Sequence, residues 1–283
     1  MSFSGAGILL GVHDVRRRLQ EGQRTVLLDV RWALGDPHGL DRYREAHLPG
    51  AVYVDLESEL SAPASAADGR HPLPAPAALQ QSARRWGINQ DEVVVAYDDA
   101  GNTASARLWW LLRHAGFPSV HLLDGGLAAW LHAGYPVQKG EERPEPGTVE
   151  LGTGHMPLAG LREVQNRSAD TVLLDARAAG RYRGEHEPVD PRAGHIPGAK
   201  SLPTTGNLGT DGRFRPVEEL RCTFASAGVD PDSPVIVYCG SGVAAAHQVA
   251  ALAIAGYPAA LYPGSWSQWS ARSELPAATG AEP

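Results

Sequence analysis

The sequence predicts an α/β protein of two duplicated domains, each a parallel sheet flanked by helices on both faces. Three observations carry this prediction. Short apolar runs rich in Val, Leu and Ile alternate with helical stretches along the 283 residues, a pattern typical of parallel sheets buried on both sides. The motifs of the first half recur in the second half in the same order. A stretch rich in Gly, Pro and Glu separates the two halves.

Four pairs of motifs indicate the duplication. Each half contains an apolar strand ending in Asp-x-Arg, a His-x-Pro-Gly-Ala segment, a second apolar strand that runs into a short loop, and a glycine turn before a tryptophan. The paired positions are Asp29 and Asp175, His47 and His195, Asp98 and Cys239, and Gly125 and Gly264. Because the spacing between partners is nearly constant, the sequence predicts two domains that arose by duplication.

The domain boundaries are predicted from composition. Residues 138–157 are rich in Gly, Pro and Glu and lack an apolar period, as is typical of a linker. Residues 1–137 are therefore assigned to an N-terminal domain and residues 158–283 to a C-terminal domain, both of ordinary size. Each domain is predicted to open with an amphipathic helix, over residues 12–21 and 158–167.

After the opening helix, each domain is expected to continue with a buried strand. These strands end at Asp29 and Asp175, and each aspartate is predicted to bond its own following loop rather than to take part in chemistry. Further apolar runs alternate with helices, as a sheet covered on both faces requires. The later helices are predicted over residues 104–115, 217–227 and 243–255.

Charge and composition limit the function classes. The net charge of −7 argues against nucleic acid or an anionic membrane as a partner, because binding phosphate needs a basic face. The first twelve residues show no basic leader and no apolar segment of membrane length, so neither a signal peptide nor an anchor is expected. No metal-ligand spacing surrounds the 11 histidines, and no metal or organic cofactor is expected.

The chain has two cysteines, Cys222 and Cys239, which are too few for a disulfide framework. A free reactive thiol suits a reducing compartment, so a cytoplasmic protein is expected. Cys222 falls within a predicted helix and has no glycine loop around it. It is therefore predicted to be half-buried and to have no role in chemistry.

Cys239 stands where a buried strand, a glycine turn and a helix meet. The run Val-Ile-Val-Tyr precedes it, Gly240 and Gly242 shape the turn, and an alanine-rich helix follows. The glycines allow successive backbone N–H groups to point into one concavity that suits an anion, and the helix N-terminus adds positive potential. A cysteine held there is expected to be rich in thiolate and nucleophilic. The alternative is a buried structural thiol.

Several reactions use a thiolate in an anion-binding loop. A cysteine phosphatase needs an arginine six positions after the cysteine, but that position is Ala245 and the loop contains no Arg or Lys. A cysteine protease needs an ordered His partner and an oxyanion hole of a different shape. The N–H groups of this loop are instead expected to converge on the outer neighbour of the sulfur, an arrangement that favours a persulfide anion on Cys239.

Taken together, the duplicated motifs and the Cys239-Gly-Ser-Gly-Val-Ala loop resemble the tandem-domain rhodanese family of sulfurtransferases over nearly the whole chain. The resemblance implies two rhodanese-like domains. It implies that the C-terminal domain is active and that the N-terminal one, with Asp98 in place of a cysteine, is not. It also implies that a sulfane sulfur passes through a Cys239 persulfide to cyanide, a small thiol or thioredoxin, without a metal or organic cofactor.

Within this family the sequence of the cysteine loop indicates which sulfur donor the enzyme uses. Thiosulfate-type members resemble Cys-Arg-Lys-Gly-Val-Thr, and mercaptopyruvate-type members resemble Cys-Gly-Ser-Gly-Val-Thr, which this chain follows except at Ala244. A neutral loop lacks the charge that would hold a dianion, so 3-mercaptopyruvate is the favoured donor. Transfer from thiosulfate to cyanide is the alternative enzyme function, and a persulfide carrier or regulatory binding module is the alternative of another class.

Mercaptopyruvate-type members are also known for an acid–His–Ser arrangement across the domain cleft. The matching residues here are Glu57, His71 and Ser241, with glutamate where the family has aspartate. The resemblance implies that Ser241, backed by His71 and Glu57, helps to protonate the leaving group. The alternative for His71 is a loop histidine packed between prolines.

The resemblance also suggests which groups bind the substrate. Arg181 matches a family arginine that contacts the substrate carboxylate, and Arg192 is a second candidate whose alternative is an exposed loop arginine. Backbone N–H groups of the loop are expected to hold the persulfide. The loop residues assigned to this binding are Gly240, Gly242, Val243 and Ala244.

Overall fold

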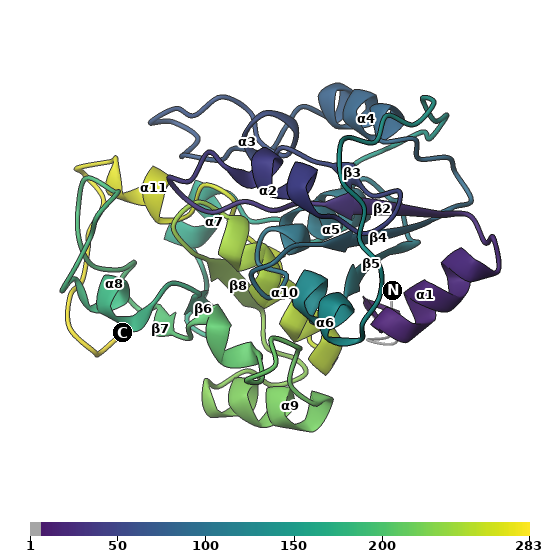
Figure 1. The fold of residues 1–283 in the computed structure, drawn as a ribbon. Helices are drawn as coiled ribbons and strands as arrows, with labels where there is room; N and C mark the ends of the chain where they lie inside the picture. The colour runs from purple at the N-terminus through teal and green to yellow at the C-terminus, as the bar shows by residue number, and fades with distance from the viewer. Residues whose placement is uncertain (1–6) are drawn as a thin grey trace.

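The computed structural model describes residues 7–283, and its N-terminal half is built on a five-stranded parallel sheet (Figure 1). The strand order is β1-β5-β4-β2-β3. The strands are β1 (Leu9–Leu10), β2 (Thr25–Asp29), β3 (Val52–Tyr53), β4 (Val93–Tyr97) and β5 (Val120–Leu123). The helices of this half are α1 (Val12–Gln20), α2 (Gly39–Glu45), α3 (Leu56–Glu59), α4 (Pro76–Arg85), α5 (Ser105–His114) and α6 (Gly126–His132).

The C-terminal half repeats this plan with a four-stranded parallel sheet in the order β7-β6-β8-β9. A parallel bridge between Leu158 and Leu261 stands where the first half has the pairing of β1 with β5. The strands are β6 (Val172–Asp175), β7 (Lys200–Ser201), β8 (Val235–Tyr238) and β9 (Ala260–Leu261). The helices are α7 (Leu161–Gln165), α8 (Ala179–Arg183), the 3₁₀ helix η1 (Thr204–Asn207), α9 (Val217–Ser226), α10 (Val243–Ala255) and α11 (Ser265–Ser270).

The strand register matches between the two sheets. Asp29 at the end of β2 lies opposite Tyr97 of β4, and Asp175 at the end of β6 lies opposite Tyr238 of β8. Each aspartate accepts hydrogen bonds from the backbone N–H and the guanidinium of the arginine two residues later. Each buried ion pair thus holds the first residues of the loop against the end of its strand, which agrees with the predicted local role of both aspartates.

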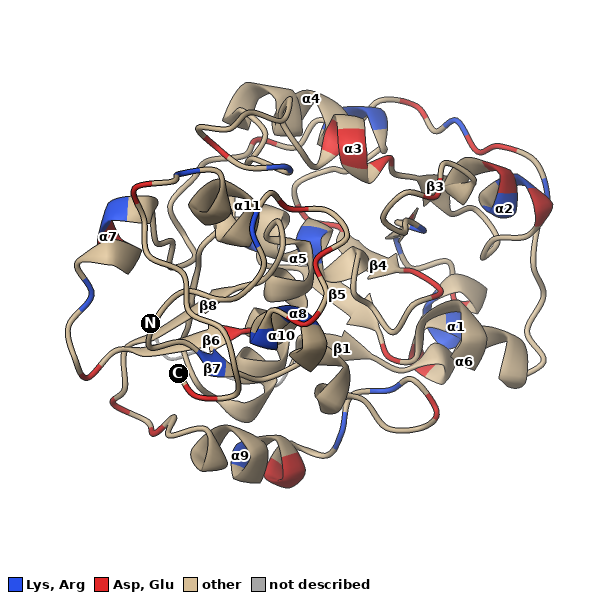
Figure 2. Ribbon diagram, turned by 90° about the vertical axis from the view of Figure 1, so that its left-hand side faces the viewer, with Lys and Arg blue, Asp and Glu red and all other residues tan. Residues whose placement is uncertain are grey.

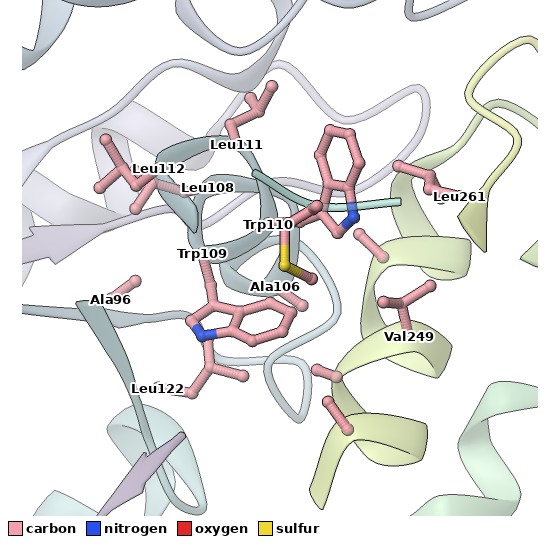
Figure 3. Close-up of a cluster of buried hydrophobic side chains, with 14 of the residues drawn as sticks. Ala96, Ala106, Leu108, Trp109, Trp110, Leu111, Leu112, Leu122, Val249 and Leu261 are labelled. Carbon is pink, nitrogen blue, oxygen red and sulfur yellow. The ribbon is translucent and has the colours of Figure 1, made fainter. Parts of the chain in front are cut away.

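The two halves pack against each other through helices α5 and α10, which follow the equivalent strands β4 and β8. Every residue of α10 except Ala244 is buried, which explains why all of its residues but His247 and Gln248 are apolar. Figure 3 shows Trp109 and Trp110 of α5 beside Val249 of α10. This packing brings the loop after each central strand close to the other domain.

The predicted helices agree with the structure to within one or two residues, with one exception. Helix α7 begins at Leu161 rather than at 158, because Leu158 pairs with Leu261 as a strand residue and Gly160 forms the N-cap. Residues 138–157 contain no helix. The backbone N–H of Val149 donates to the Ile88 carbonyl at 3.1 Å, and Val149 is buried, so the predicted linker is fastened to the N-terminal half.

The surface carries both signs of charge. In the view of Figure 2, basic and acidic segments alternate along the outer loops and helices, as on α2 and α9. Within residues 7–283 no helix is long and apolar enough to cross a membrane, and no cluster of three His, Cys, Asp or Glu side chains is placed to bind a metal ion. Residues 1–6 lie outside the described part of the chain and belong to the segment in which neither a signal peptide nor an anchor was expected.

Candidate active site

Cys239 directly follows β8, at the carboxyl end of the parallel sheet where ligands bind in such folds. Its side chain is buried, and the backbone N–H of Gly242 donates to its Sγ at 3.1 Å. Gly242 has a φ of +81°, and a Cβ there would lie 2.7 Å from the Pro263 carbonyl oxygen. Only glycine therefore allows the chain to curl around the sulfur at this point.

The turn after β9 holds the cysteine loop from the side. Ser265 Oγ accepts the Cys239 N–H at 3.1 Å and donates to the Tyr262 carbonyl at 2.8 Å. The N–H groups of Trp266 and Ser267 donate to the carbonyls of Cys239 and Gly240, both at 2.9 Å. The Pro-Gly-Ser-Trp motif thus fixes the backbone beneath the sulfur, a role that its sequence did not reveal.

Three predicted residues from the two domains meet beside the cysteine. His71 Nδ1 lies 2.7 Å from Ser241 Oγ, and His71 Nε2 lies 3.1 Å from both carboxylate oxygens of Glu57. Trp32 Nε1 also donates to Glu57 at 2.8 Å. The structure therefore brings together the predicted acid–His–Ser set, with Glu57 and His71 from one domain and Ser241 from the other.

The environment of His71 sets its protonation. The ring is buried, and burial lowers the pKa of His71 below its ordinary value, while Glu57 acts in the opposite direction. A neutral imidazole with its Nε2–H on the Glu57 carboxylate leaves Nδ1 as an acceptor for the Ser241 hydroxyl. The neighbouring Asp55 is not part of this set, because it caps α3 by accepting the Ser58 N–H.

Two arginines lie over the mouth of the loop. A Cβ on Gly240 would be 3.0 Å from Nη2 of Arg70 and 3.3 Å from Nη1 of Arg181. Arg181 was predicted, but Arg70 was missed, although it stands next to His71 in the sequence. Arg181 donates to Asp190 at 2.9 Å and to Glu187 at 2.7 Å, and Arg70 also pairs with Asp190.

The prediction that Arg192 binds substrate does not fit its contacts. Its guanidinium donates to the carbonyls of Trp269, Ser270, Arg272 and Leu275 at 2.8 to 3.0 Å. These bonds commit four of its five N–H donors to the end of α11 and the segment that follows it. Arg192 therefore fastens the C-terminal segment to the preceding loop, a structural role that leaves its predicted contact with substrate unsupported.

Cys222 also differs from its prediction, because its side chain is exposed rather than half-buried. It lies on α9, whose buried face is formed by Leu220 and Phe224.

The equivalent loop of the N-terminal domain is filled by its own side chain. Asp98 is buried, and its two carboxylate oxygens accept four backbone N–H groups at 2.8 to 2.9 Å. The donors are Ala100, Asn102, Ala104 and Ser105. The loop that follows a central strand in this fold is thus shaped to bind one anion.

Comparison with known proteins agrees with this geometry. The family model for the rhodanese-like domain matches residues 12–133 and again residues 161–272. The chain belongs to the rhodanese family. The two matched stretches confirm the predicted duplication, and the parallel sheets flanked by helices confirm the predicted fold class.

Named relatives extend over nearly the whole chain. A putative thiosulfate sulfurtransferase, SseB of Mycobacterium tuberculosis, is 45% identical over 96% of this chain and 97% of its own length. A probable 3-mercaptopyruvate sulfurtransferase of Pseudomonas aeruginosa is 46% identical over 96% of this chain and 98% of its own length. The crystal structure of SseA from Escherichia coli, a 3-mercaptopyruvate sulfurtransferase, superposes with a TM-score of 0.81 at 31% identity, covering 93% of this chain and all of that one. This rhodanese-family member is a sulfurtransferase, as its sequence predicted.

Proposed function

We propose that this sulfurtransferase moves the thiol sulfur of 3-mercaptopyruvate, by way of a persulfide on Cys239, to a small thiol or cyanide. The observation that carries the choice of donor is the hydrogen-bonded chain from Glu57 through His71 to Ser241, two residues after the cysteine. Relatives bear the names of both donors, so the relatives alone do not decide between them. The proton relay and the uncharged loop favour mercaptopyruvate.

The first step is attack by the Cys239 thiolate on the thiol sulfur of the donor. The new S–S bond forms as the C–S bond breaks, and the electron pair of that bond passes to the carbon, giving the enolate of pyruvate. The proton of the donor thiol is transferred to this carbon, so that pyruvate leaves and Cys239 carries a persulfide anion. Ser241 takes part in this transfer because His71 accepts its hydroxyl proton.

Arg181 and Arg70 are suited to hold the donor carboxylate. Both guanidinium groups lie over Gly240 at the mouth of the loop, and planar N–H forks match carboxylates in geometry and charge. Asp190 bridges the two arginines, and a substrate carboxylate would compete with Asp190 for their N–H donors. Arg70 is therefore proposed as the second carboxylate-binding arginine, the role for which the sequence had suggested Arg192.

The second half of the reaction restores the thiolate. The backbone N–H groups of the loop, including those of Gly240, Gly242, Val243 and Ala244, stabilise the persulfide anion. An acceptor nucleophile attacks the outer sulfur, the S–S bond breaks, and its electron pair returns to Cys239 as thiolate. Cyanide would leave as thiocyanate and a thiol as its persulfide. Reduced thioredoxin is a further proposed acceptor.

Thiosulfate transfer is the second candidate. Two guanidinium groups at the loop mouth suit a sulfur oxyanion as well as a carboxylate, which is the observation in its favour. The test is steady-state turnover with each donor against cyanide, using wild type, Ser241→Ala and Cys239→Ser. Mercaptopyruvate turnover that exceeds thiosulfate turnover and falls selectively in the Ser241 variant would support the proposal. A preference for thiosulfate in both wild type and Ser241→Ala would overturn the choice of mercaptopyruvate as donor. Activity in Cys239→Ser would overturn the assignment of Cys239 as the nucleophile.

We propose a cytoplasmic location for this reaction. The nucleophilic thiol of Cys239 and the exposed thiol of Cys222 are both free, and both persist in a reducing compartment.

A further inference from the structure

A buried arginine from the N-terminal domain lies behind the cysteine loop. Arg107 belongs to α5, and its side chain is fully buried where the two domains meet. Its Nη2 donates to the carbonyl of His71 at 2.9 Å, and its Nη1 lies 3.5 Å from the carbonyl of Gly242. A Cβ on Gly242 would lie 3.2 Å from Nη1, so the guanidinium packs directly against the residue whose N–H bonds the Cys239 sulfur.

Arg107 has no carboxylate partner among residues 7–283. Its hydrogen-bond acceptors are backbone carbonyls, namely those of Leu60, His71, Pro72 and Gly242. Burial lowers the pKa of Arg107 to about 10, so the group remains a cation at neutral pH, and its interaction with Cys239 opposes that decrease. A buried cation without an opposite charge is costly, so a nearby anion is expected to compensate it.

The other charged groups near the loop are already matched. Arg70 and Arg181 share Asp190, and Arg181 also pairs with Glu187. On the other side, His71 faces Glu57. Arg107 is thus the cation around the loop whose charge remains without a carboxylate, and the sulfur of Cys239 is the anion-forming group next to it.

We infer that Arg107 is the counter-cation of the Cys239 sulfur, through which the N-terminal domain stabilises the thiolate and the persulfide of the C-terminal domain. The inference rests on the proposed role of Cys239 as nucleophile. Arg107 is a positioning residue, because it acts across the Gly242 backbone rather than on the substrate. The N-terminal domain, which lacks the nucleophile, would then contribute Arg107 to the chemistry in addition to Glu57 and His71.

The duplication offers an internal comparison for this inference. By the spacing that pairs Asp98 with Cys239, the equivalent of Arg107 in α10 is Gln248, which is buried and bonded to Asn207 at 2.8 Å. The position that matches Arg107 in the sequence of the other domain is therefore a neutral amide, and the Asp98 carboxylate already has four N–H donors. This comparison suggests Arg107→Gln as the test variant.

The experiment measures the ultraviolet absorbance of the Cys239 thiolate against pH. Exposed Cys222 is first replaced by serine, and the spectrum of the Cys222→Ser, Cys239→Ser protein is subtracted. We expect Arg107→Gln to raise the midpoint of the titration by at least about one pH unit, since removal of a close opposite charge has effects of this size. Arg107→Lys keeps the charge and is expected to keep most of the effect. The control is Arg113→Gln on the same helix, whose side chain donates to the Pro118 carbonyl.

An unchanged midpoint in a folded Arg107→Gln protein would overturn the inference, even if Cys239→Ser is inactive. Activity that survives Cys239→Ser would instead overturn the proposed function, so the two failures are distinguishable. Should Arg107→Gln not fold, the thermal stability of wild type and Cys239→Ser is compared. If the thiolate is stabilised in the folded protein, the thermal stability of wild type should increase relative to that of Cys239→Ser as the pH rises toward about 8.5, the ordinary pKa of a thiol. A difference that is constant with pH would overturn the inference.

Discussion

The loops after β4 and β8 are equivalent by duplication, yet one contains Asp98 and the other Cys239. Both curl through a glycine with positive φ, Gly101 at 69° and Gly242 at 81°. The Asp98 carboxylate reaches into its own loop and accepts four backbone N–H groups, whereas the shorter thiol accepts one, from Gly242. The same backbone shape therefore surrounds a carboxylate with four N–H donors in one domain and a thiol with a single N–H donor in the other.

This comparison suggests which donors would hold a persulfide. The residues that correspond to the four donors around Asp98 are Ser241, Val243, Ala245 and Ala246. Ala245 and Ala246 lie beyond the loop to which the sequence assigned this binding, because the N-terminal loop shows that the first turn of the following helix also contributes. A persulfide on Cys239 would extend the side chain toward this set, as the carboxylate of Asp98 does in the other domain.

The largest effect is expected from Cys239→Ser. Loss of the nucleophile removes the covalent intermediate, so sulfur transfer should fall by more than about a thousandfold with either donor. The measurement is thiocyanate production from mercaptopyruvate and thiosulfate. The matched control is Asp98→Asn, which changes the equivalent residue of the other loop and should leave turnover of the folded enzyme within about twofold. Equal losses in the two variants would contradict the division of roles.

Ser241→Ala and His71→Asn should separate the two donors. Both changes break the proton relay, and general acid–base steps contribute about a hundredfold or more, so kcat with mercaptopyruvate should fall by that amount. Thiosulfate needs no proton at carbon, and its kcat should change by only a few fold. Because burial lowers the pKa of His71, the wild-type rate with mercaptopyruvate should fall only below about pH 6.5, when the imidazole gains a proton. A loss of kcat of the same size with both donors would show that Ser241 and His71 maintain the structure of the site and do not transfer a proton.

Arg181→Gln should raise KM for mercaptopyruvate by about tenfold or more, because a charge-assisted bond to the carboxylate is lost. The measurement is the KM of each variant at saturating cyanide. Arg183→Gln is the control, since its exposed side chain pairs with Glu185 outside the site. Arg192→Gln should leave KM unchanged and lower the stability of the C-terminal segment. A comparable rise in KM for Arg192→Gln would restore Arg192 as the second substrate-binding arginine that the sequence suggested. An unchanged KM for Arg181→Gln would contradict the proposed role of Arg181.

Asp98→Asn should have the smallest effect on activity and a clear effect on stability. An amide replaces an oxygen acceptor by a donor, so that two backbone N–H groups of the loop lose their partner. The free energy of unfolding should fall by about 2 kcal/mol. Urea denaturation measures this value, and an unchanged midpoint would show that the four hydrogen bonds around Asp98 do not stabilise the loop.

Much of the fold could be predicted from the sequence because its signals are local. Apolar runs such as Val-Val-Val-Ala-Tyr in β4 and the glycines around Cys239 report their own conformations. Because the chain contains the motifs twice, each local signal could be checked against its counterpart in the other half. The start of α7 was missed because Leu158 is committed to a partner about a hundred residues away, Leu261, and no local pattern shows that pairing.

The site was predicted only as far as the residues carry local or family signals. Cys239, Ser241 and His71 do so, but the partners of the arginines depend on tertiary placement. Arg192 bonds carbonyls that come more than seventy positions later, and those carbonyls have no sequence signature. Arg107 left one trace in the sequence, as a charged residue directly before the apolar run 108–112 of α5. The meaning of this trace is visible only when the Cys239 loop of the other domain lies beside it.

The most direct test of the account is the mass of the protein after incubation with 3-mercaptopyruvate in the absence of an acceptor. We predict a gain of one sulfur atom, located by peptide mapping at Cys239 and lost again when cyanide is added. Sulfur found only on the exposed Cys222, or retained by the Cys239→Ser protein, would contradict it.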